Sequence, residues 1–443
     1  MAQQVLSIEY RPLASIRFDP QNPRLHSKKQ INQIARSVET FGFNVPVLID
    51  GKGQLIAGHG RVLAAQLLGM TQVPTIMLEN LTETQIRAFM IADNRLTENS
   101  VWDDRLLAEQ LKALAVLELD FSIDVTGFEM GEIDVMIEDL TPASSGKDDP
   151  ADAIPDFGTR PQVTGAGDLW VLDRHRVYCG DARDRAAYSV VMKDRRADMG
   201  FADPPYNDPI DGYVTGFGKV HHAEFAVASG EMSESEFTDF LTNVLTRLAS
   251  NSVDGALQFI CMDWRHSGEL ISAASSVYEE FKNLCVWVKE GAGQGSLYRS
   301  QHELVFVFKN GKRPHRNNIQ LGQYGRYRTN VWQYRRVNSP FRTTEDGNLS
   351  ALHPTIKPVD LVADAILDCT ARGDVVLDPF LGSGTTVIAA ERTGRTCYGI
   401  ELDPHYVDLV VRRWQGFTGQ NAVLESTGRN FNEIEQENHG RDN

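Results

Sequence analysis

The sequence lacks long apolar runs and is poor in cysteine. No stretch of 18 consecutive apolar residues occurs in the 443 residues, so we expect no membrane span. The start, MAQQVLSIEYRPL, does not combine a basic segment with an apolar core, and we expect no signal peptide. The five cysteines are scattered without CxxC spacing, which favours reduced thiols in the cytoplasm over disulfides or a zinc site. We therefore expect no bound metal.

Basic residues are also in deficit, with 44 Lys and Arg against 60 Asp and Glu and a net charge of −16. This balance argues against a uniformly nucleic-acid-binding surface. The charges are unevenly distributed, however. Residues 118–156 hold 12 acids and one base, whereas residues 289–342 hold 11 bases and two acids. We expect the binding of an anionic partner to be local to the second stretch.

The length of 443 residues predicts two or three domains, and the expected alternation of strands and helices predicts an α/β chain. We interpret residues 1–118 as a small α/β domain, 119–160 as an acidic linker with a short helix near 130–139, and 161–443 as a second domain. Residues 418–443 are polar, and we expect them to be frayed.

Periodicity and turn residues predict the regular elements of both domains. In the first, we expect strands at 46–50, 54–58 and 72–78, a helix after residue 58, and helices at 82–96 (capped by Thr82) and 102–116. In the second, we expect strands at 168–172, 175–180, 197–203, 256–262, 283–289, 303–309, 374–380 and 395–402. Its helices are expected at 233–250, 266–281, 357–370 and 385–394. This alternation predicts a largely parallel sheet with helices on both faces.

A glycine-rich turn within residues 374–403 indicates a nucleotide-type ligand. An apolar strand ends at Asp378, Gly382-Ser383-Gly384 form the turn, and a helix and a second strand ending at Glu401 follow. In such a βαβ unit the ligand lies at the carboxyl ends of the strands, where Glu401 can accept hydrogen bonds from two ribose hydroxyls. The spacing matches neither GxGxxG nor GxxxxGK[ST], which disfavours a dinucleotide and a P-loop.

The segment FADPPY, residues 201–206, is a second junction of strand and turn. Taken alone, it is more typical of a type I turn with proline at the second position. Yet Asp203 and the Pro204 carbonyl are acceptors, and the two prolines remove two backbone donors. A pocket that offers only acceptors suits an amino group, and Tyr206 can stack on a flat ring.

Together, ADPPYN and DPFLGSGTT resemble the catalytic and cofactor motifs of amino-methyltransferases that act on DNA with S-adenosylmethionine. The catalytic motif comes first, as in the β-class of that family, whose target-recognition region lies between the two motifs. Residues 289–342 occupy that place. VYCGDA (177–182) and HPTIKPVDL (353–361) resemble further motifs of the family. The resemblance spans roughly 165–415 and implies a Rossmann-like methyltransferase sheet.

The resemblance implies a catalytic set and a cofactor-binding set. The catalytic residues are Asp203, Pro204, Pro205 and Tyr206. The residues for S-adenosylmethionine are Asp181, Ala182, Thr355, Lys357, Pro358, Asp378, Phe380, Gly382, Gly384, Thr385, Thr386 and Glu401. Asp203 and the Pro204 carbonyl would accept the N–H bonds of a flipped adenine N6 amine. Asp rather than Ser at position 203 favours adenine, and the N4 amine of cytosine stays open.

Residues 289–342 interleave basic and aromatic side chains, which is typical of backbone contacts combined with base stacking. The candidates for contacts to DNA are Arg299, Arg326, Arg328, Arg335 and Arg336. We expect double-stranded DNA as the partner, with RNA as an alternative, and the resemblance is compatible with a homodimer. Residues 208–232, which are glycine-rich, are interpreted as a loop that closes over the flipped base.

The segment at 55–78, LIAGHGRVLAAQLLGMTQVPTIML, is similar to the nucleotide-binding segment of ParB-type N-terminal domains. That segment is usually written Gly-Glu-Arg-Arg; here Gly58 and Arg61 keep the frame, whereas His59 and Gly60 replace the charged pair. The loss of charge argues against triphosphate binding and hydrolysis, and favours a domain that makes protein or DNA contacts. A DNA-bound regulator with a vestigial methyltransferase is the alternative, although the intact motifs argue against decay.

Overall fold

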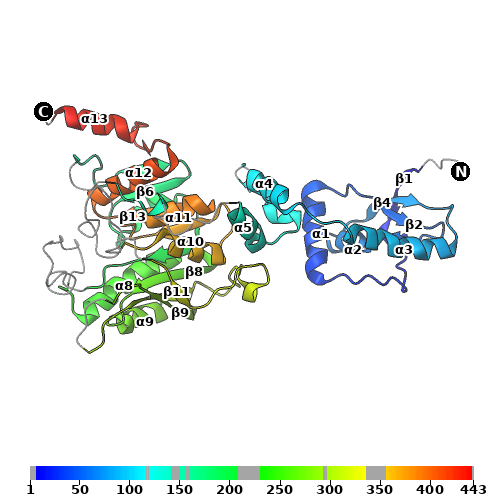
Figure 1. Cartoon of the computed structure of the whole chain (residues 1–443), viewed down its shortest axis with the longest axis horizontal. Helices are drawn as coiled ribbons and strands as arrows, with labels where there is room; N and C mark the ends of the chain where they lie inside the picture. The colour runs from blue at the N-terminus through cyan, green and yellow to red at the C-terminus, as the bar shows by residue number, and fades with distance from the viewer. Residues whose placement is uncertain are drawn as a thin grey trace. The chain divides into compact units, whose positions relative to one another are not determined.

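In the computed structural model of the protein, the chain forms two units, Met1–Thr141 and Pro142–Asn443 (Figure 1). The structure describes residues 6–115, 117, 119–140, 150–155, 160–207, 230–292, 297–335 and 356–441. Within these residues, no helix combines the length and the apolarity needed to cross a bilayer. The helix predicted near 130–139 is present and belongs to the first unit, although the sequence places it in a linker.

The first unit is an α/β fold around a small sheet with the strand order β1-β4-β2-β3. Its strands are β1 (Ile8–Pro12), β2 (Val47–Ile49), β3 (Leu55–Ala57) and β4 (Gln72–Met77). Its helices are α1 (Lys28–Phe41), α2 (His59–Leu67), α3 (Glu83–Glu98), α4 (Asp104–Ala115), the 3-10 turn η2 (Ile123–Thr126) and α5 (Met130–Asp139). The predicted cap of α3 is confirmed, because the Thr82 side chain accepts the Gln85 N–H and the Gln85 side chain accepts the Thr82 N–H. β1 and α1 have no counterpart among the predicted elements.

The second unit is built on a mixed sheet which, in the described part of the chain, has ten strands in the order β11-β9-β10-β8-β7-β12-β13-β6-β5-β14. The strands are β5 (Leu169–Leu172), β6 (His175–Cys179), β7 (Ala197–Ala202), β8 (Ser252–Met262), β9 (Glu280–Val288), β10 (His302–Lys309), β11 (Val331–Gln333), β12 (Val375–Asp378), β13 (Thr396–Glu401) and β14 (Val423–Leu424). The central strands β8, β7, β12, β13 and β6 run parallel, whereas β10 and β5 are antiparallel to their neighbours. The expected Rossmann-like sheet is therefore confirmed at its centre.

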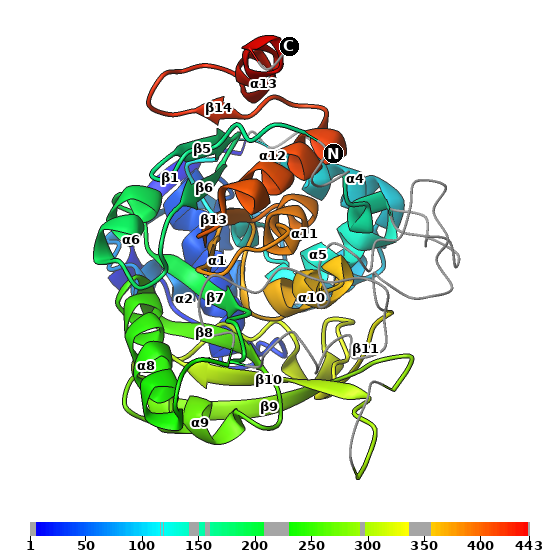
Figure 2. The same cartoon turned by 90° about the vertical axis from the view of Figure 1, so that its left-hand side faces the viewer.

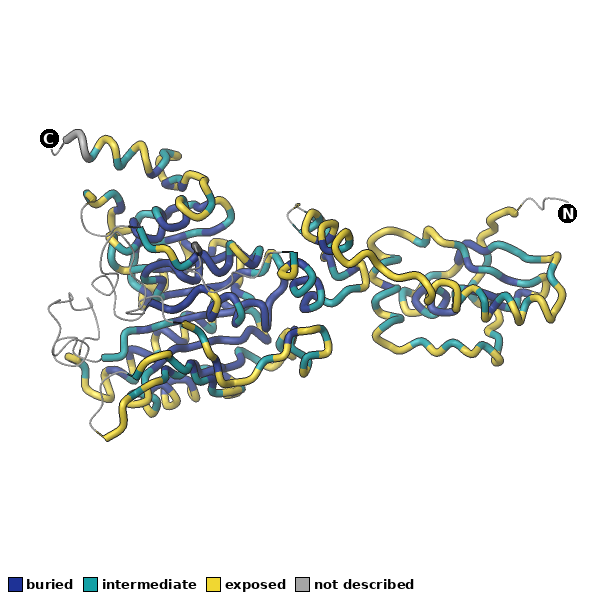
Figure 3. The backbone as a smooth tube through the Cα atoms, in the orientation of Figure 1, coloured by how far each residue is buried: buried dark blue, intermediate teal, exposed yellow. Residues whose placement is uncertain are grey.

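Helices cover both faces of this sheet (Figure 2). They are α6 (Arg185–Met192), α8 (Glu234–Ser250), α9 (Ser267–Ser275), α10 (Val359–Cys369), α11 (Thr385–Thr393), α12 (Pro404–Thr418) and α13 (Phe431–Arg441). Successive strand residues point to opposite faces. Phe201 thus belongs to the core cluster with α10, α11 and α12, whereas Ala202 belongs to the cluster with α6, α8 and α9. Figure 3 shows the buried central strands of this unit between their helices.

The C-terminal segment corrects one prediction. Phe431, at the start of α13, is fully buried, and its ring centroid lies 5.1 Å from that of Trp170 in β5. β14 also pairs with β5. Because a buried aromatic ring removes a large apolar surface from water, it anchors a segment that is polar in composition. The expectation that residues 418–443 are frayed is wrong for the part that the structure describes, which ends at 441.

Candidate active site

Adjacent parallel strands bring four acids to one edge of the sheet of the second unit. β7, β12, β13 and β6 are neighbours in that order and run in the same direction. The acids at their carboxyl ends are Asp203 after β7, Asp378 on β12, Glu401 on β13 and Asp181 after β6. Because parallel strands end at the same edge, these residues share one rim despite their separation in sequence. This rim is the usual place for a ligand in an open α/β sheet.

The glycine turn between β12 and α11 is held by two of these acids. The Gly382 N–H donates to Glu401 Oε2 at 2.7 Å, and the Thr386 hydroxyl donates to Asp378 Oδ2 at 2.6 Å. Gly384 caps α11 with a φ of 80°, in the left-handed region that favours glycine. A Cβ added to Gly382 would meet no atom within 4 Å. The turn therefore faces open space at the rim.

Burial changes the acidity of both acids that hold the turn. Burial raises the pKa of Asp378 to about 7, although the hydrogen bond from Thr386 lowers it. Burial also raises the pKa of Glu401 to about 7, against the lowering effect of the backbone N–H groups of Asp403 and Gly382. Each carboxyl group therefore changes its charge near neutral pH, and each is a strong acceptor only above that pH.

Arg413 of α12 braces the same turn from the protein interior. Its buried guanidinium donates to the Ser383 carbonyl at 3.0 Å, the Thr385 hydroxyl at 3.3 Å and the Ala151 carbonyl at 2.9 Å. The Thr385 hydroxyl itself donates to the Lys357 carbonyl at 3.2 Å. Arg413 thus ties the turn to the segments before α10 and before β5. No motif in the sequence marks this residue, because it lies inside an ordinary amphipathic helix.

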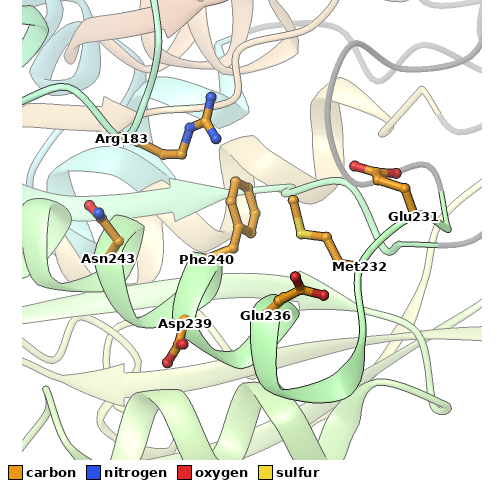
Figure 4. A pocket seen from close by; sticks show the side chains of 7 residues that line it. All are labelled: Arg183, Glu231, Met232, Glu236, Asp239, Phe240 and Asn243. Atoms are coloured by element: carbon orange, nitrogen blue, oxygen red, sulfur yellow. The ribbon is translucent and has the colours of Figure 1, made fainter.

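A cavity of about 410 Å³ opens beside Asp181 and Phe380, two of the predicted cofactor residues, which contact residues of its lining (Figure 4). Its lining residues are Arg183, Glu231, Met232, Glu236, Asp239, Phe240 and Asn243. Asp181 holds the Arg183 guanidinium, with Nε 3.0 Å and NH2 2.6 Å from its carboxylate. The ring centroids of Phe240 and Phe380 are 6.2 Å apart. The cavity thus combines an aromatic wall with charged and amide groups.

Asp203 is held by two donors where β7 ends. Lys357 Nζ lies 2.6 Å from Asp203 Oδ2, and the Tyr206 hydroxyl donates to Oδ1 at 2.8 Å. Pro204 and Pro205 follow, and neither has a backbone N–H. The structure therefore brings two of the four predicted catalytic residues, Asp203 and Tyr206, together with Lys357, which the resemblance assigns to the cofactor set.

Glu303 completes this cluster and is absent from the predicted site. Its Oε1 lies 2.5 Å from Lys357 Nζ and 2.7 Å from the Tyr206 hydroxyl, and its Oε2 lies 2.7 Å from Lys289 Nζ. Glu303 is the second residue of β10, which is antiparallel to β8, so it lies at the edge where the parallel strands end. The signal available in the sequence was a lysine at the end of the predicted strand 283–289 and a glutamate at the start of the predicted strand 303–309, and such charged strand ends are too common to identify a site.

Burial and opposite charges set the protonation of the cluster. Burial raises the pKa of Asp203, and Lys357 offsets this only in part. Burial also raises the pKa of Glu303, but Lys357 and Lys289 lower it more, so the net shift is downward. For Lys357, burial lowers the pKa and the two carboxylates raise it more. Cys261 Sγ, Asp203 and Glu303 have ligand atoms within 4.8 Å of one another, but the ammonium groups of Lys357 and Lys289 already balance the charges of the two carboxylates.

Part of the predicted site lies outside the described residues. This holds for Thr355, Arg336 and residues 208–229 of the predicted closing loop. At the described ends of that loop, the Asn207 amide donates to the Met232 carbonyl at 2.7 Å.

The structure contradicts the predicted DNA contacts of Arg326 and Arg328. Arg326 has a side chain only 5% exposed, and it pairs with Asp364 at 3.0 Å and Asp368 at 2.9 Å. Arg328 pairs with the same two carboxylates at 2.9 and 3.2 Å. Both guanidinium groups are thus neutralised within the fold, against α10, and are not available to phosphates. Arg335, in contrast, has a side chain that is 71% exposed.

In the first unit, the turn that resembles a nucleotide-binding segment is closely packed. Gly58 has a φ of 99°, and a Cβ added there would lie 2.7 Å from Val47 Cγ1. The Arg61 guanidinium donates to the carbonyls of Val45 at 2.6 Å and Pro46 at 3.0 Å. Arg61 therefore holds the loop before β2.

Three family models match this chain. The model of the ParB N-terminal domain matches residues 2–94, and that of the ParB-methyltransferase HTH domain matches 105–165. The model N6_N4_Mtase, a DNA methylase, matches 197–412. The last match begins at β7 and ends in α12, so it contains the Asp203 cluster and the glycine turn.

Known proteins resemble the two units separately. The ParB-like nuclease domain-containing protein YnaK of Escherichia coli K12 is 50% identical over 80 residues, which are 18% of this chain and 92% of YnaK. The type II methyltransferase M2.MboI of Moraxella bovis is 28% identical over 257 residues, covering 55% of this chain and 88% of the relative. The crystal structure of the M1.HpyAVI–SAM complex aligns with a TM-score of 0.39 and 20% identity, over 54% of this chain and 97% of that chain.

Proposed function

Since the chain belongs to the N6/N4 DNA methylase family and also carries ParB N-terminal and ParB-methyltransferase HTH domains, we propose that it transfers a methyl group from S-adenosylmethionine to the N6 amine of adenine in DNA. The observation that carries the proposal is the position of Asp203. It shares a sheet edge with Asp378 and Glu401, and two residues without a backbone N–H follow it. An amine acceptor thus lies on the same rim as the nucleotide-type turn.

The residues around Asp203 suit the activation of an aromatic amine. Such an amine is a poor nucleophile because its lone pair is delocalised into the ring. The Asp203 carboxylate and the Pro204 carbonyl can each accept one N–H bond, which favours a pyramidal nitrogen with a directed lone pair. The Tyr206 hydroxyl is held by Asp203 and Glu303, so its ring has a defined position for stacking on the base. Positioning of this kind can contribute about 7–11 kcal/mol to catalysis.

The residues near the glycine turn fit S-adenosylmethionine, the cofactor of this family. Gly382 faces open space that a side chain would fill, and Glu401 offers carboxylate oxygens at the end of β13 for ribose hydroxyls. The cavity beside Phe240 and Arg183 offers an aromatic wall for a flat ring. When bound, the cofactor supplies a methyl group on a positively charged sulfur, and the chain's own residues hold and orient it.

The target base and the partner are the finer parts of the proposal. Asp rather than Ser at position 203 supports adenine, while cytosine N4 is the second candidate because the family name covers both amines. The HTH match supports double-stranded DNA as the partner, and a base in a duplex must flip out to reach the site. Arg299 and Arg335, both exposed, remain the candidates for backbone contacts.

Two properties of the whole protein remain proposals. Five buried, free cysteines support the cytoplasm as the location, because reduced thiols persist there. The homodimer that the resemblance allows is tested by the sedimentation of the full chain with and without DNA.

Methyl transfer from tritiated S-adenosylmethionine to duplex DNA tests the activity. Asp203→Ala should lower the rate at least about 100-fold, because it removes an acceptor that acts on the reacting amine. Asp263→Ala is the matched control: Asp263 directly follows the neighbouring strand β8, but it pairs with His266 and Arg265. A rate near that of the wild type for Asp203→Ala would overturn the proposed role.

The identity of the product separates the candidates. Mass spectrometry of nucleosides from the digested DNA should detect N6-methyladenine. If N4-methylcytosine is found instead, the target base is cytosine and not adenine, and the proposed methyltransferase activity still stands. If the wild-type chain methylates neither base in any duplex of host DNA, the proposed activity is contradicted.

A further inference from the structure

Glu303 touches two members of the proposed active site, yet nothing so far assigns it a role. We propose that Glu303, anchored by Lys289, is a positioning residue that fixes Lys357 and Tyr206 on Asp203 and thereby orients the carboxylate that receives the target amine. The contacts are Lys357 at 2.5 Å, the Tyr206 hydroxyl at 2.7 Å and Lys289 at 2.7 Å. The inference deepens the proposed function and rests on it.

The sheet places these groups on rigid elements. Lys289 directly follows β9 and Glu303 is the second residue of β10, and the two strands pair so that Glu303 lies opposite Trp287. β10 pairs in turn with β8, where Leu304 lies opposite Met262. The side chains of Glu303 and Lys357 are 4% and 5% exposed, and that of Lys289 is 15% exposed. A buried carboxylate on a strand that is paired on both sides can hold its neighbours with little freedom, which suits a positioning role.

The number of protons that Tyr206 and Lys357 can donate explains why the second carboxylate, that of Glu303, is needed. Tyr206 has a single phenolic proton within reach of Asp203 Oδ1 and Glu303 Oε1. Lys357 has three protons, and its ammonium contacts one oxygen of each carboxylate. Without Glu303, the ammonium would be free to cover both oxygens of Asp203. With Glu303, it stays on Oδ2, and lone pairs of Asp203 remain for the amine.

Charges from every element around Asp203 enter the cluster. Lys357 faces it from the segment before α10, Glu303 from β10, Cys261 from β8 and Asp378 from β12. Burial raises the pKa of the Cys261 thiol well above its usual value, so this group stays neutral. The charges that change Asp203 are therefore those of Lys357, Glu303 and Asp378, together with the Tyr206 hydroxyl.

Two substitutions should shift the titration of Asp203 in opposite directions. Glu303→Gln removes a like charge and leaves Lys357 to Asp203 alone, and both effects lower the pKa of Asp203. Lys289→Met leaves Glu303 without its second partner, so that Glu303 draws Lys357 away, and the pKa of Asp203 rises. A side chain that only fills space would not produce opposite shifts.

Single-turnover methyl transfer by the full chain, measured from about pH 5 to about pH 9, tests the inference. Glu303→Gln should slow the transfer at least about tenfold and move the acid limb to lower pH, with cofactor affinity changed by less than about threefold. Lys289→Met should move the acid limb to higher pH. Glu280→Gln is the control, since Glu280 begins β9 at the opposite end from the site and pairs with Lys282 and Lys309.

The outcomes separate this inference from the proposed function. If the wild type methylates DNA and neither variant moves the acid limb, the role of Glu303 is overturned alone. If the wild type methylates no base, the proposed function fails. In that case the free energy of chemical unfolding of the same two variants, measured against pH, tests the role of Glu303. Shifts of the pH dependence in opposite directions support the control of Asp203 by Glu303. Profiles identical to that of the wild type overturn it. Unfolding also exposes a variant that does not fold, and Lys289→Met, at a less buried position, keeps the test valid.

Discussion

Each unit contains a strand that is connected to the following helix through a Gly-x-Gly sequence. The two turns differ in where the helix begins. In the first unit β3 ends at Ala57 and α2 begins at His59, so the helix starts directly after Gly58. In the second unit β12 ends at Asp378 and α11 begins at Thr385, so the helix starts only after the second glycine. The same three-residue pattern thus has two registers relative to its helix.

The register decides whether space for a ligand remains. At Gly58 and Gly60 an added Cβ would meet Val47 Cγ1 at 2.7 Å and Ile34 Cδ1 at 2.9 Å, so side chains fill that turn. In the second turn a Cβ on Gly384 would also lie 2.9 Å from Val410 Cγ1, but one on Gly382 would meet no atom within 4 Å, so the open space lies at the first glycine. The longer connection also carries an acid at its strand end. A Gly-x-Gly sequence alone therefore predicts only a tight turn. A binding site is indicated when an acid also ends the preceding strand and the connection to the helix is longer.

The largest expected effect breaks the open turn. Gly382→Val places a branched side chain in the open space and at a φ of 52°, which such residues rarely adopt. The affinity for S-adenosylmethionine should fall at least about 100-fold, or about 2.7 kcal/mol, by isothermal titration calorimetry. Gly60→Val, the matched change in the packed turn, should leave this affinity unchanged. Equal losses in both variants would refute the distinction between the turns.

The two acids that hold the turn at Gly382 predict that the stability of the protein depends on pH. The packed turn at Gly58 predicts no such dependence. With pKa values of about 7 for Asp378 and Glu401, the folded state holds protons that the unfolded state has already lost. Stability should therefore fall as pH rises from about 4 to about 7, by up to about 1.4 kcal/mol per pH unit for each group. Glu401→Gln should flatten this decline in urea unfolding of the full chain. An unchanged slope in that variant would contradict the assignment.

Cofactor affinity should follow the opposite course over the same range. It should rise as Glu401 ionises, because a carboxylate accepts hydroxyl hydrogen bonds better than a carboxylic acid does. Calorimetric titrations at several pH values check this rise, and Glu401→Gln should remove most of it.

A smaller effect is expected from strain in the packed turn. Gly58→Ala introduces a Cβ at a φ of 99° and only 2.7 Å from Val47 Cγ1. The first unit should lose about 1–3 kcal/mol of stability, read as earlier proteolysis of that unit, with methyl transfer measured on the second unit as the control. A variant as resistant as the wild type would show that the turn relaxes without cost.

The smallest effect is expected from a substitution that tests the role of Arg61. Arg61→Ala removes hydrogen bonds to the carbonyls of Val45 and Pro46, at a cost of about 1–2 kcal/mol to the first unit. Added nucleoside triphosphate should stabilise neither the wild type nor the variant. Stabilisation of the wild type alone, in a thermal shift assay, would show that Arg61 serves a nucleotide instead of the loop before β2.

Local patterns were enough to predict much of the fold. The Thr82 cap, the central strands and the helix after the glycine turn all depend on residues a few positions apart. The shared edge of Asp203, Asp378 and Glu401 also follows from the pattern, because each acid ends a strand in an alternating α/β sequence. β1 was missed because it is short and mostly exposed, so that it becomes recognisable only through its pairing with β4. α1 was missed although Ile31, Ile34 and Val38 recur at helical spacing, a signal that the sequence did contain.

The errors concern residues whose partners are distant in sequence. Arg326 and Arg328 lie in a basic stretch that is typical of a nucleic-acid contact, but their carboxylate partners are on α10. Residues 418–443 have a polar composition, but Phe431 finds Trp170. In each case the free energy of a long-range contact outweighs what the local composition suggests.

The sequence by itself determined where strands end, where the chain turns and which acids stand at the turns, because neighbouring residues set these features. Only the tertiary structure decided which charges meet. Lys289 contacts Glu303 because β9 ends and β10 begins at the edge where β7 ends, and Glu303 shares Lys357, from the segment before α10, with Asp203. Strand order and register depend on the packing of the whole unit, so no local pattern could have shown that Lys357 lies between the proposed catalytic acid and Glu303.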